Sequence, residues 1–410
     1  MNILFISQIV PYPPHGGVLQ RGYNLLREIG QHNDVHLLAF VHPETLGTPE
    51  LVEESRYELL KHCTSVQYFP LWPKQSIAHK IAAFSIGLLY PRPFSVLAHM
   101  SAAYRQEIRR ILEVEAIDLL HVDTIGLAPY RKLATGIPCV LTHHNIESRL
   151  MERRAEVETS TLRKYYIGLQ ARRLRIFEAE QSPLFDMNLM MSSNDEIDLL
   201  RIAPGVATAI IPNGVDISYF TPATENHELA AIYTGGMNMY ANKDAVLYFL
   251  RDIWPAILRR HPTAKFYAIG QDPPRELNEI SQCDPSVIVT GFVDDVRPYV
   301  RKAAVYVVPL RVGGGTRLKV LDALAQGKAI VSTSVGCEGI GVTHGRDIYI
   351  EDDPVQFADR VSTLFADAEA RRTLGTAARE IAVSGYGWTA IGTDLQRVYE
   401  DVVQKRSPRD

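Results

Sequence analysis

Short runs of apolar and β-branched residues alternate along the chain with longer stretches in which apolar positions recur at helical spacing. This alternation is typical of βαβ units, in which helices cover a parallel sheet. In the N-terminal half the pattern predicts strands near residues 2–9, 34–41, 65–70, 118–122, 138–142 and 187–192. It also predicts a helix over 18–30 and one long helix over 146–181.

The alternation restarts in the C-terminal half. It predicts strands near 230–236, 264–270, 287–291, 304–310 and 329–333, and helices near 241–260, 294–302 and 315–326. A stretch rich in Pro, Gly and Thr separates the halves and is typical of a linker. We therefore expect an α/β protein with a doubly wound N-terminal domain over 1–205, a linker over 206–228, a second doubly wound domain over 229–386, and a last helix over 387–410 that packs on either domain.

Glycines lie in the loop between the first strand and its helix, in the run PYPPHGGVLQR. Doubly wound sheets bind ligands beyond the carboxyl ends of their strands, and two such domains that face each other form a cleft there. Gly16 and Gly17 would let backbone amides approach an anion at a helix N-terminus. A plain turn explains them equally well. Neither G-x-G-x-x-G nor G-x-x-x-x-G-K-[ST] occurs, so a dinucleotide site and a P-loop are both disfavoured.

The segment PLRVGGGTRLKVLDALAQGKAIVST (309–333) carries the clearest candidate chemistry. Three glycines, Gly313 to Gly315, lie between a predicted strand and a predicted helix, so amides and the helix dipole would point at one spot. Arg317 and Lys319 add positive charge there, and a diphosphate would fit. The carboxylate of Asp322 only accepts hydrogen bonds, which suits sugar or ribose hydroxyls better than phosphates. The alternative is a glycine turn beside solvated cations.

Two adjacent histidines, His143 and His144, follow a strand directly in LTHHNIES. That position is at the edge of the sheet where we expect ligands. A structural reading is also open, in which Asn145 caps the following helix and one histidine is simply packed in the core.

Composition and charge narrow the function classes. Of the 410 residues 46% are hydrophobic and 22% are charged, as in an ordinary folded protein. The net charge of −4 disfavours a long nucleic acid as a partner. The four cysteines lie far apart with no C-x-x-C pair, so we expect neither a zinc site nor a disulfide framework. The first residues are typical of a strand rather than a signal peptide, and no uncharged apolar stretch is as long as a membrane span.

One segment departs from the nearly even balance of basic and acidic residues in the whole chain. Residues 61–112 contain seven Lys or Arg and one acidic residue, interleaved with large apolar side chains, most densely over 72–97. This arrangement suits an anionic membrane surface or a lipid-phosphate acceptor, although a solvated basic face beside ordinary core would look the same. We expect a cytoplasmic protein, either free or in peripheral contact with the inner face of the membrane.

Several motifs resemble those of retaining nucleotide-sugar glycosyltransferases of the family-4 type, which have the GT-B fold. They are IIPNGVD, YTGG followed by NKDA, VTGFVDDV and VPLRVGGGTRLKVLDALAQGKAIVSTSVGCEG in the C-terminal half, and PYPPHGG and THHNIE in the N-terminal half. The resemblance implies that the C-terminal domain holds a nucleotide diphosphate-sugar, that the N-terminal domain holds the acceptor, and that neither a metal nor another cofactor is needed. The absence of a D-x-D triplet agrees with that.

The resemblance also assigns residues to the diphosphate and the transferred sugar. It implies that Gly16 and Gly17 approach the donor phosphates, that Arg317 and Lys319 clamp the diphosphate, and that His144 lies near the transferred sugar. His144, Arg317 and Lys319 are thus the expected catalytic residues.

Further donor contacts are implied around these. Asp322 stands at the second Glu of the family's E-x7-E motif, which contacts the ribose, whereas the first Glu falls at Gly314. Sugar contacts would then come from backbone amides of four residues: Gly313, Gly314, Gly315 and Thr316. Two further groups border the donor, Gly235 and Gly236 in YTGG, and Gly291, Phe292 and Val293 beside the nucleobase.

The leading hypothesis is a retaining, metal-independent transfer of a sugar to a hydroxyl of a glycan, glycolipid or small molecule, in cell-envelope or exopolysaccharide synthesis. Two alternatives stay open. One is a nucleotide-sugar epimerase of the same fold, and the other is a degenerate subunit that binds a nucleotide sugar without turning it over.

Overall fold

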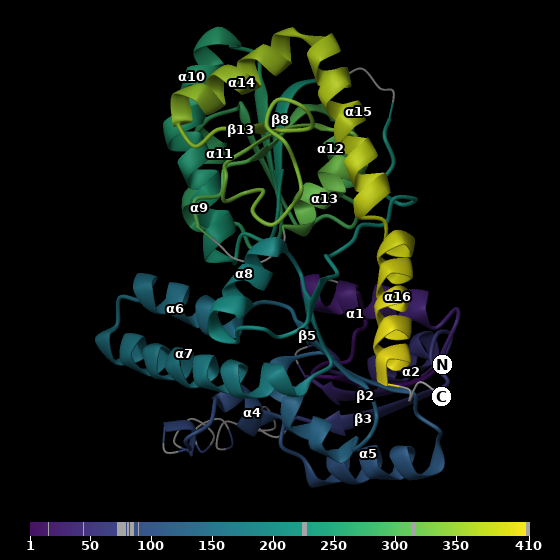
Figure 1. Ribbon diagram of the computed structural model, residues 1–410. Coiled ribbons are helices and arrows are strands. Elements are labelled where there is room, and N and C mark those ends of the chain that lie inside the picture. The colour runs from purple at the N-terminus through teal and green to yellow at the C-terminus, as the bar shows by residue number, and fades with distance from the viewer. Residues whose placement is uncertain are drawn as a thin grey trace. The chain divides into compact units, whose positions relative to one another are not determined.

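The computed structural model describes the chain except for residues 15, 44, 72–78, 80–81, 83–85, 89, 224–227, 313–316 and 407–410. The chain divides into two compact units (Figure 1). Unit 1 comprises Met1–Pro212 and Ile391–Asp410, and unit 2 comprises Asn213–Ala390. Each unit is built on a parallel sheet with helices, so the expected α/β fold of two doubly wound, Rossmann-like domains is confirmed.

Unit 1 contains a seven-stranded sheet in the order β3-β2-β1-β4-β5-β6-β7. The strands are apolar and most of their residues are buried, as expected for a parallel sheet covered on both faces. Their bounds are β1 (Asn2–Ser7), β2 (Asp34–Val41), β3 (Ser65–Pro70), β4 (Leu119–Val122), β5 (Cys139–His143), β6 (Met187–Met190) and β7 (Thr208–Ile210). The edge strand β7 lies within the stretch read as a linker, and the boundary between the units follows Pro212.

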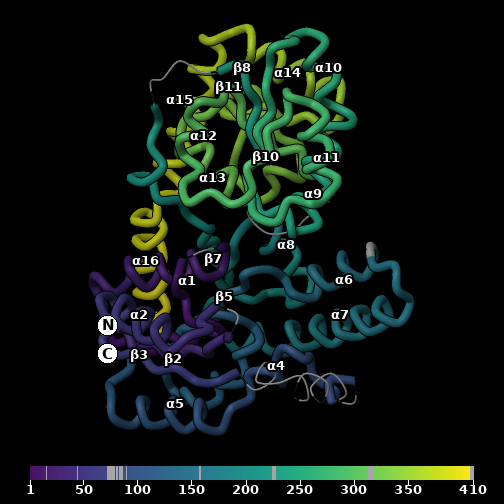
Figure 2. Tube along the Cα trace, turned by 180° about the vertical axis from the view of Figure 1, so that it is seen from behind, coloured from purple at the N-terminus to yellow at the C-terminus, as the bar shows by residue number. Residues whose placement is uncertain are grey.

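The helices of unit 1 alternate with these strands. They are α1 (Gly17–Ile29), α2 (Pro49–Leu59), α4 (Phe94–Ala98), α5 (Ala102–Val114), α6 (Glu147–Val157), α7 (Thr161–Gln181) and α8 (Ser193–Ile202), with short helices η2 (Ile125–Leu133) and η3 (Ser182–Leu184). The last helix, α16 (Trp388–Arg406), belongs to unit 1 from Ile391 onward. It lies beside α1 in Figures 1 and 2. Gly392 of α16 packs so closely on Glu28 of α1 that any larger side chain would collide.

The prediction of one helix over 146–181 is wrong. The chain forms two helices, α6 and α7, which pack side by side (Figure 1). The side chain of Glu158 accepts a hydrogen bond of 2.9 Å from the backbone N–H of Ser160, and both residues have extended backbone angles. A side chain that captures a backbone amide in this way competes with the helix and ends it.

Unit 2 contains a six-stranded sheet in the order β10-β9-β8-β11-β12-β13. The strands are β8 (Glu228–Thr234), β9 (Lys265–Ile269), β10 (Val287–Gly291), β11 (Ala303–Val308), β12 (Ala329–Ser332) and β13 (Tyr349–Ile350). The helices are α9 (Tyr240–Tyr248), α10 (Trp254–Arg260), α11 (Arg275–Cys283), α12 (Arg297–Lys302), α13 (Leu318–Ala325), α14 (Pro354–Ala366) and α15 (Ala368–Gly385). A π-turn, η4 (Phe249–Ile253), joins α9 to α10 just before Pro255, which lacks an N–H to donate.

Candidate functional site

Three neighbouring strands of unit 2 end in glycine turns at the same edge of the sheet. Gly235 follows β8 and its N–H donates to the carbonyl of Ile269 at 2.9 Å. Gly270 follows β9 and donates to the carbonyl of Gly291 at 3.0 Å. A side chain on Gly270 would collide with the backbone of Gly235. The carboxyl ends of β8, β9 and β10 therefore form a continuous edge of close-packed backbone, which a ligand can approach closely.

Lys319, near the start of α13, reaches this edge. Its Nζ donates to the hydroxyl of Tyr233 at 2.7 Å and to Oδ1 of Asn242 at 2.8 Å. The Tyr233 hydroxyl in turn donates to Asn242 Oδ1 at 2.6 Å, and Asn242 Nδ2 donates to the carbonyl of Gly236 at 2.8 Å. Gly235 has φ +153°, which other residues rarely adopt, and a side chain there would displace Lys319 Nζ, so this turn favours glycine. The network fixes the ammonium group directly against the YTGG turn.

The charges in this cluster are buried. Burial, reinforced by the nearby Arg317 guanidinium, lowers the pKa of Lys319 to about 7, and Asp322 only partly opposes this. Burial likewise raises the pKa of Asp322 to about 7 against the pull of Lys319. Arg317 is 9% exposed. Two basic side chains thus share a desolvated site with one carboxylate of weakened acidity, an arrangement that an anionic ligand would stabilise.

The structure brings most of the predicted donor residues of unit 2 to one edge of the sheet. Gly291 lies two strands from β8, which at about 4.8 Å per strand is about 10 Å away. Phe292 beside it is 70% exposed, whereas Val293 packs against the core. The predicted amide donors over 313–316 lie outside the described residues, so that contact stays a prediction.

A second cluster forms at the carboxyl ends of the strands of unit 1. Asp123 follows β4 and His144 follows β5, and their Oδ1 and Nε2 atoms are 3.3 Å apart. Ser7, at the end of β1, donates to Asp123 Oδ2 at 3.1 Å. Burial alone would raise the pKa of Asp123, but His144 and Arg21 oppose this and its pKa lies below its ordinary value. Asp123 is therefore a buried carboxylate that lies within ion-pair distance of the His144 ring.

Arg21 of α1 and His121 of β4 support this carboxylate. The Arg21 guanidinium is buried and donates to the carbonyls of Ile211 and Pro212 at 2.8 and 2.7 Å. Burial lowers its pKa to about 10, while Asp123 opposes the shift. Burial also lowers the pKa of His121 to about 3, so that this imidazole is a neutral structural group.

The two adjacent histidines have different surroundings. His143 is buried within unit 1, where Nε2 lies 3.1 Å from Oδ1 of Asn188 on β6, and burial lowers its pKa to about 4. His144 turns toward Asp123 instead. His143 is the last residue of β5, whereas His144 lies in the bend that follows the strand. Gly16, at the N-terminus of α1, has φ +94° and open space where a side chain would lie.

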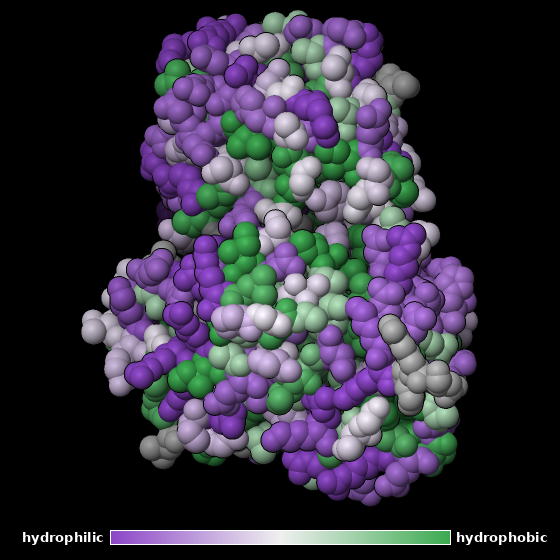
Figure 3. Space-filling view, in the orientation of Figure 1, coloured by the Kyte–Doolittle hydropathy of each residue, from purple (hydrophilic) through white to green (hydrophobic). Residues whose placement is uncertain are grey.

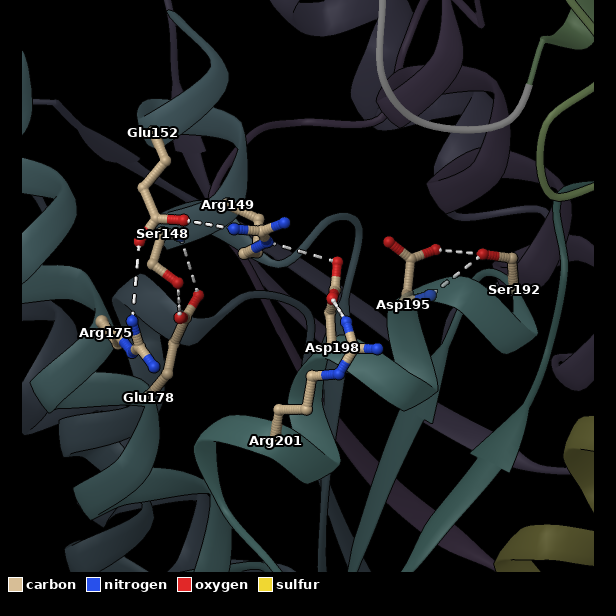
Figure 4. A network of polar contacts seen from close by, with 9 residues as sticks. All are labelled: Ser148, Arg149, Glu152, Arg175, Glu178, Ser192, Asp195, Asp198 and Arg201. Atoms are coloured by element: carbon tan, nitrogen blue, oxygen red, sulfur yellow. Dashed lines mark hydrogen bonds and ion pairs between the residues drawn. The ribbon is translucent and has the colours of Figure 1, made fainter. Parts of the chain in front are cut away.

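The segment after His144 is held by a polar network. The alternative in which Asn145 caps the following helix is wrong, because the capping position of α6 is Ile146, with no side-chain bond to the helix. Instead Ser148 donates to Glu178 of α7 through its backbone N–H at 3.2 Å and its hydroxyl at 2.5 Å (Figure 4). Burial raises the pKa of Glu178 to about 7, although the Ser148 bonds oppose the shift.

Ion pairs extend this network toward α8 (Figure 4). Arg149 lies 2.6 Å from Glu152 and 3.5 Å from Asp198, and Arg201 lies 3.1 Å from Asp198. Since α6 begins only three residues after His144, these contacts also restrict where that histidine can lie.

Several members of these clusters were not predicted from the sequence, among them Tyr233, Asn242 and Asp123. Tyr233 and Asn242 occur in motifs quoted for the resemblance, but nothing local shows that they hold Lys319. Asp123 has a better local signal, since it is the first acidic residue after the apolar run of β4. A polar residue at the carboxyl end of a buried strand is a general pointer to a ligand-binding edge.

The basic segment is described only in part, because most of 72–89 lies outside the described residues. Its C-terminal portion includes α5, whose surface is hydrophilic (Figure 3, bottom). Arg110 on this helix pairs with Glu107 at 2.6 Å. In the described part of the chain, no helix is both long and apolar enough to span a membrane, and no three His, Cys, Asp or Glu side chains group as metal ligands would. All four cysteines are free thiols.

Comparisons with known proteins agree with this architecture. Residues 15–219 match the family described as Glycosyltransferase Family 4, and residues 228–367 match Glycosyl transferases group 1. An uncharacterized 44.6 kDa protein in the cps region of Klebsiella pneumoniae is 22% identical, over 98% of this chain and 99% of that protein. Phosphatidyl-myo-inositol mannosyltransferase of Mycobacterium tuberculosis is 24% identical over 47% of this chain and 53% of its own length.

Solved structures share the whole fold. Sucrose-phosphate synthase from Thermosynechococcus elongatus superposes with a TM-score of 0.71 at 16% identity and covers 99% of this chain and 100% of its own. HepE from Anabaena in complex with UDP has a TM-score of 0.67 at 14% identity and covers 98% and 100%, and it has also been solved with UDP-glucose. The expected GT-B fold is thereby confirmed. With one family model covering half of its length and a second covering most of the remainder, this chain belongs to glycosyltransferase family 4 and is a glycosyltransferase of the GT-B type.

Proposed function

We propose that this glycosyltransferase moves a sugar from a nucleotide diphosphate-sugar to a hydroxyl of a glycan, glycolipid or small molecule, with retained anomeric configuration and without a metal ion. The observation that carries the proposal is the buried pair of basic side chains, Lys319 and Arg317, against the glycine edge of unit 2. The complexes of HepE with UDP and UDP-glucose support the donor class. The cps region of the Klebsiella relative supports a role in cell-envelope or exopolysaccharide synthesis.

The chemistry follows from where negative charge develops. As the bond from the sugar to the diphosphate breaks, the departing diphosphate gains charge, and preorganised cations in a desolvated site stabilise that charge strongly. Lys319 and Arg317 supply these cations. Asp322, on the next turn of α13, is suited to accept hydrogen bonds from ribose hydroxyls.

In unit 1, His144 would position the transferred sugar. Its Nε2 faces Asp123, which leaves Nδ1 for a sugar hydroxyl or carbonyl. Ser7 donates to the other carboxylate oxygen of Asp123 and so holds that side chain in place. A histidine beside a fixed carboxylate would contribute by orienting the reacting atoms.

The test is a donor panel. Nucleotide release is measured with UDP-, GDP- and ADP-sugars, with and without acceptor and with and without a chelator, and the product's anomeric configuration is read by NMR. We expect acceptor-dependent release that survives chelation and gives the donor's own configuration. An epimerase would alter the sugar without releasing nucleotide, and an inactive binding subunit would bind donor without turnover.

We further propose that unit 1 receives a phosphate-bearing lipid acceptor and contacts an anionic membrane peripherally. Four basic side chains line a cavity of about 390 Å³ in which Tyr130 and Phe177 form apolar walls. These basic residues are Arg92, Arg105, Arg109 and Lys132. Such a cavity suits a phosphorylated headgroup at a lipid surface.

Sedimentation with anionic and neutral vesicles tests the membrane contact. We expect salt-sensitive recovery with anionic vesicles only, reduced by the double variant Arg105→Gln, Arg109→Gln. Arg110→Gln is the matched control, since Arg110 lies on the same helix outside the cavity and already pairs with Glu107. Equal recovery with both vesicle types, or none with either, would remove the proposal.

A further inference from the structure

A second cavity lies at the opposite edge of the sheet of unit 2, about 650 Å³ in volume. Ala304, at the start of β11, and Lys328 and Ala329, at the start of β12, form its floor. The cluster around Lys319 lies at the carboxyl ends of the strands, whereas this cavity lies at their amino ends. The two are therefore separate sites within one unit.

The cavity is strongly basic. Five cationic side chains line it, and Glu380 is the one acidic residue among the described lining residues. The cations are Arg301, Lys328, Arg371, Arg372 and Arg379. In a chain of net charge −4, this concentration of positive charge is a local feature and not a reflection of composition.

Most of these cations are held by neutral carbonyl groups, which leave their charge uncompensated. Lys328, which is 4% exposed, donates to the carbonyl of Ala303 at 2.5 Å, and burial, reinforced by Arg371, lowers its pKa to about 7. Arg379 donates to the carbonyls of Phe220 at 2.8 Å and Ile217 at 2.9 Å. Arg372 differs from these, since it pairs with Glu369 on α15.

Three buried polar atoms around the cavity lack a hydrogen-bond partner: Nε of Arg301, Nε of Arg371 and Oε1 of Gln326. A buried polar group without a partner is unfavourable and unusual in native proteins. Two of the three are guanidinium donors, which are suited to the oxygens of a phosphate. Gln326 Oε1 would accept a hydroxyl.

We propose that this cavity binds a phosphorylated small molecule, with the phosphate held by the Arg301 and Arg371 guanidinium groups and a hydroxyl-bearing body against Gln326. Its volume is within the range of small-molecule pockets and well above what a lone phosphate fills. The ligand class is thus a sugar phosphate or a nucleoside monophosphate. The site is independent of the donor and acceptor sites.

Binding is measured by calorimetry and thermal shift with glucose 6-phosphate, uridine monophosphate, inorganic phosphate and glucose. We expect at least one organic phosphate to bind and raise Tm, inorganic phosphate to bind more weakly, and glucose not to bind. Arg301→Gln should weaken binding about 10- to 100-fold, as for the loss of a hydrogen bond between charged groups. Arg275→Gln is the matched control, because it removes one exposed charge from the same unit outside the cavity.

A second variant guards against misfolding of the first. Thr376→Glu places a carboxylate among the cations from the α15 wall and should abolish binding by occupying them. Lys319→Ala, in the cluster proposed to hold the nucleotide, should leave binding of glucose 6-phosphate unchanged, and this control omits uridine monophosphate because that probe also fits the nucleotide site. The proposal is overturned if no phosphorylated probe binds, if Arg301→Gln and Thr376→Glu both bind normally, or if Lys319→Ala removes binding while the cavity variants retain it.

Discussion

Binding of a nucleoside diphosphate beside Lys319 should take up a proton. In the free protein burial and Arg317 lower the pKa of Lys319 to about 7, so at pH 8 about nine in ten of these side chains are neutral. A diphosphate against the amine favours the charged form and raises the pKa toward its ordinary value of 10.5. At pH 8 binding would then consume about 0.9 proton per site.

The affinity should follow the same linkage. Above pH 7 the amine is mostly neutral in the free protein, so binding must first protonate it. Kd should therefore rise by up to about tenfold for each pH unit, until the pH reaches the pKa of the amine in the complex. If binding returned the pKa of Lys319 fully from about 7 to 10.5, this would contribute about 4.8 kcal/mol to the free energy of binding, which is an upper limit. A Kd that rises with pH distinguishes this buried lysine, because an ordinary exposed lysine stays charged throughout this range.

Calorimetry of UDP at pH 8, in buffers with different ionisation enthalpies, measures the proton uptake directly. At this pH the terminal phosphate of UDP has already lost its second proton, whose pKa is about 6. Lys319→Arg is the matched control, since it keeps the charge and cannot titrate. Asp322→Asn removes the second group whose pKa lies near 7 and isolates the lysine.

The assignment of this proton to Lys319 fails if wild-type protein binds UDP at pH 8 with no proton uptake. It fails equally if Lys319→Arg takes up as much as the wild type, because the proton would then go elsewhere. No binding of UDP, GDP or ADP at any pH would instead contradict the proposed donor class.

Three further predictions concern single residues. Arg317→Ala should weaken UDP binding about 10- to 100-fold in calorimetry, and unchanged affinity would exclude it from the diphosphate clamp. His144→Ala should lower turnover by about 100-fold with nearly unchanged nucleotide affinity, whereas His143→Ala should mainly lower Tm, and exchanged phenotypes would assign the positioning role to His143. Glu178 has a pKa raised from 4.5 to about 7, so its contribution to stability is full below pH 4.5 and is lost as pH rises through 7. Between pH 5 and 8, Glu178→Gln should therefore gain stability relative to wild type, by at most about 3 kcal/mol in the free energy of unfolding measured by denaturant titration. A difference between the two proteins that does not change with pH would argue against burial as the cause.

Local patterns were sufficient for the fold class and for most of the strands, although the short strands β7 and β13 were not predicted. Apolar runs such as those of β2 and β12 occur where they were expected, because a strand buried on both faces must be apolar along its whole length. The loops after strands could also be named in advance, since the carboxyl edge of a parallel sheet is set by chain direction alone. The break between α6 and α7 was missed because it depends on one side-chain bond, from Ser160 to Glu158, that apolar periodicity does not report.

The contacts within the sites depend on tertiary structure. Lys319 meets Tyr233 and Asn242 across more than seventy residues, and His144 meets Asp123 on a neighbouring strand. The shifted pKa values arise there as well, because desolvation is a property of the packed environment and not of the residue type. The basic cavity is the clearest case. Its cations come from α12, α15 and the start of β12, where each alone looks like an ordinary surface charge, and only the folded sheet gathers them around one space.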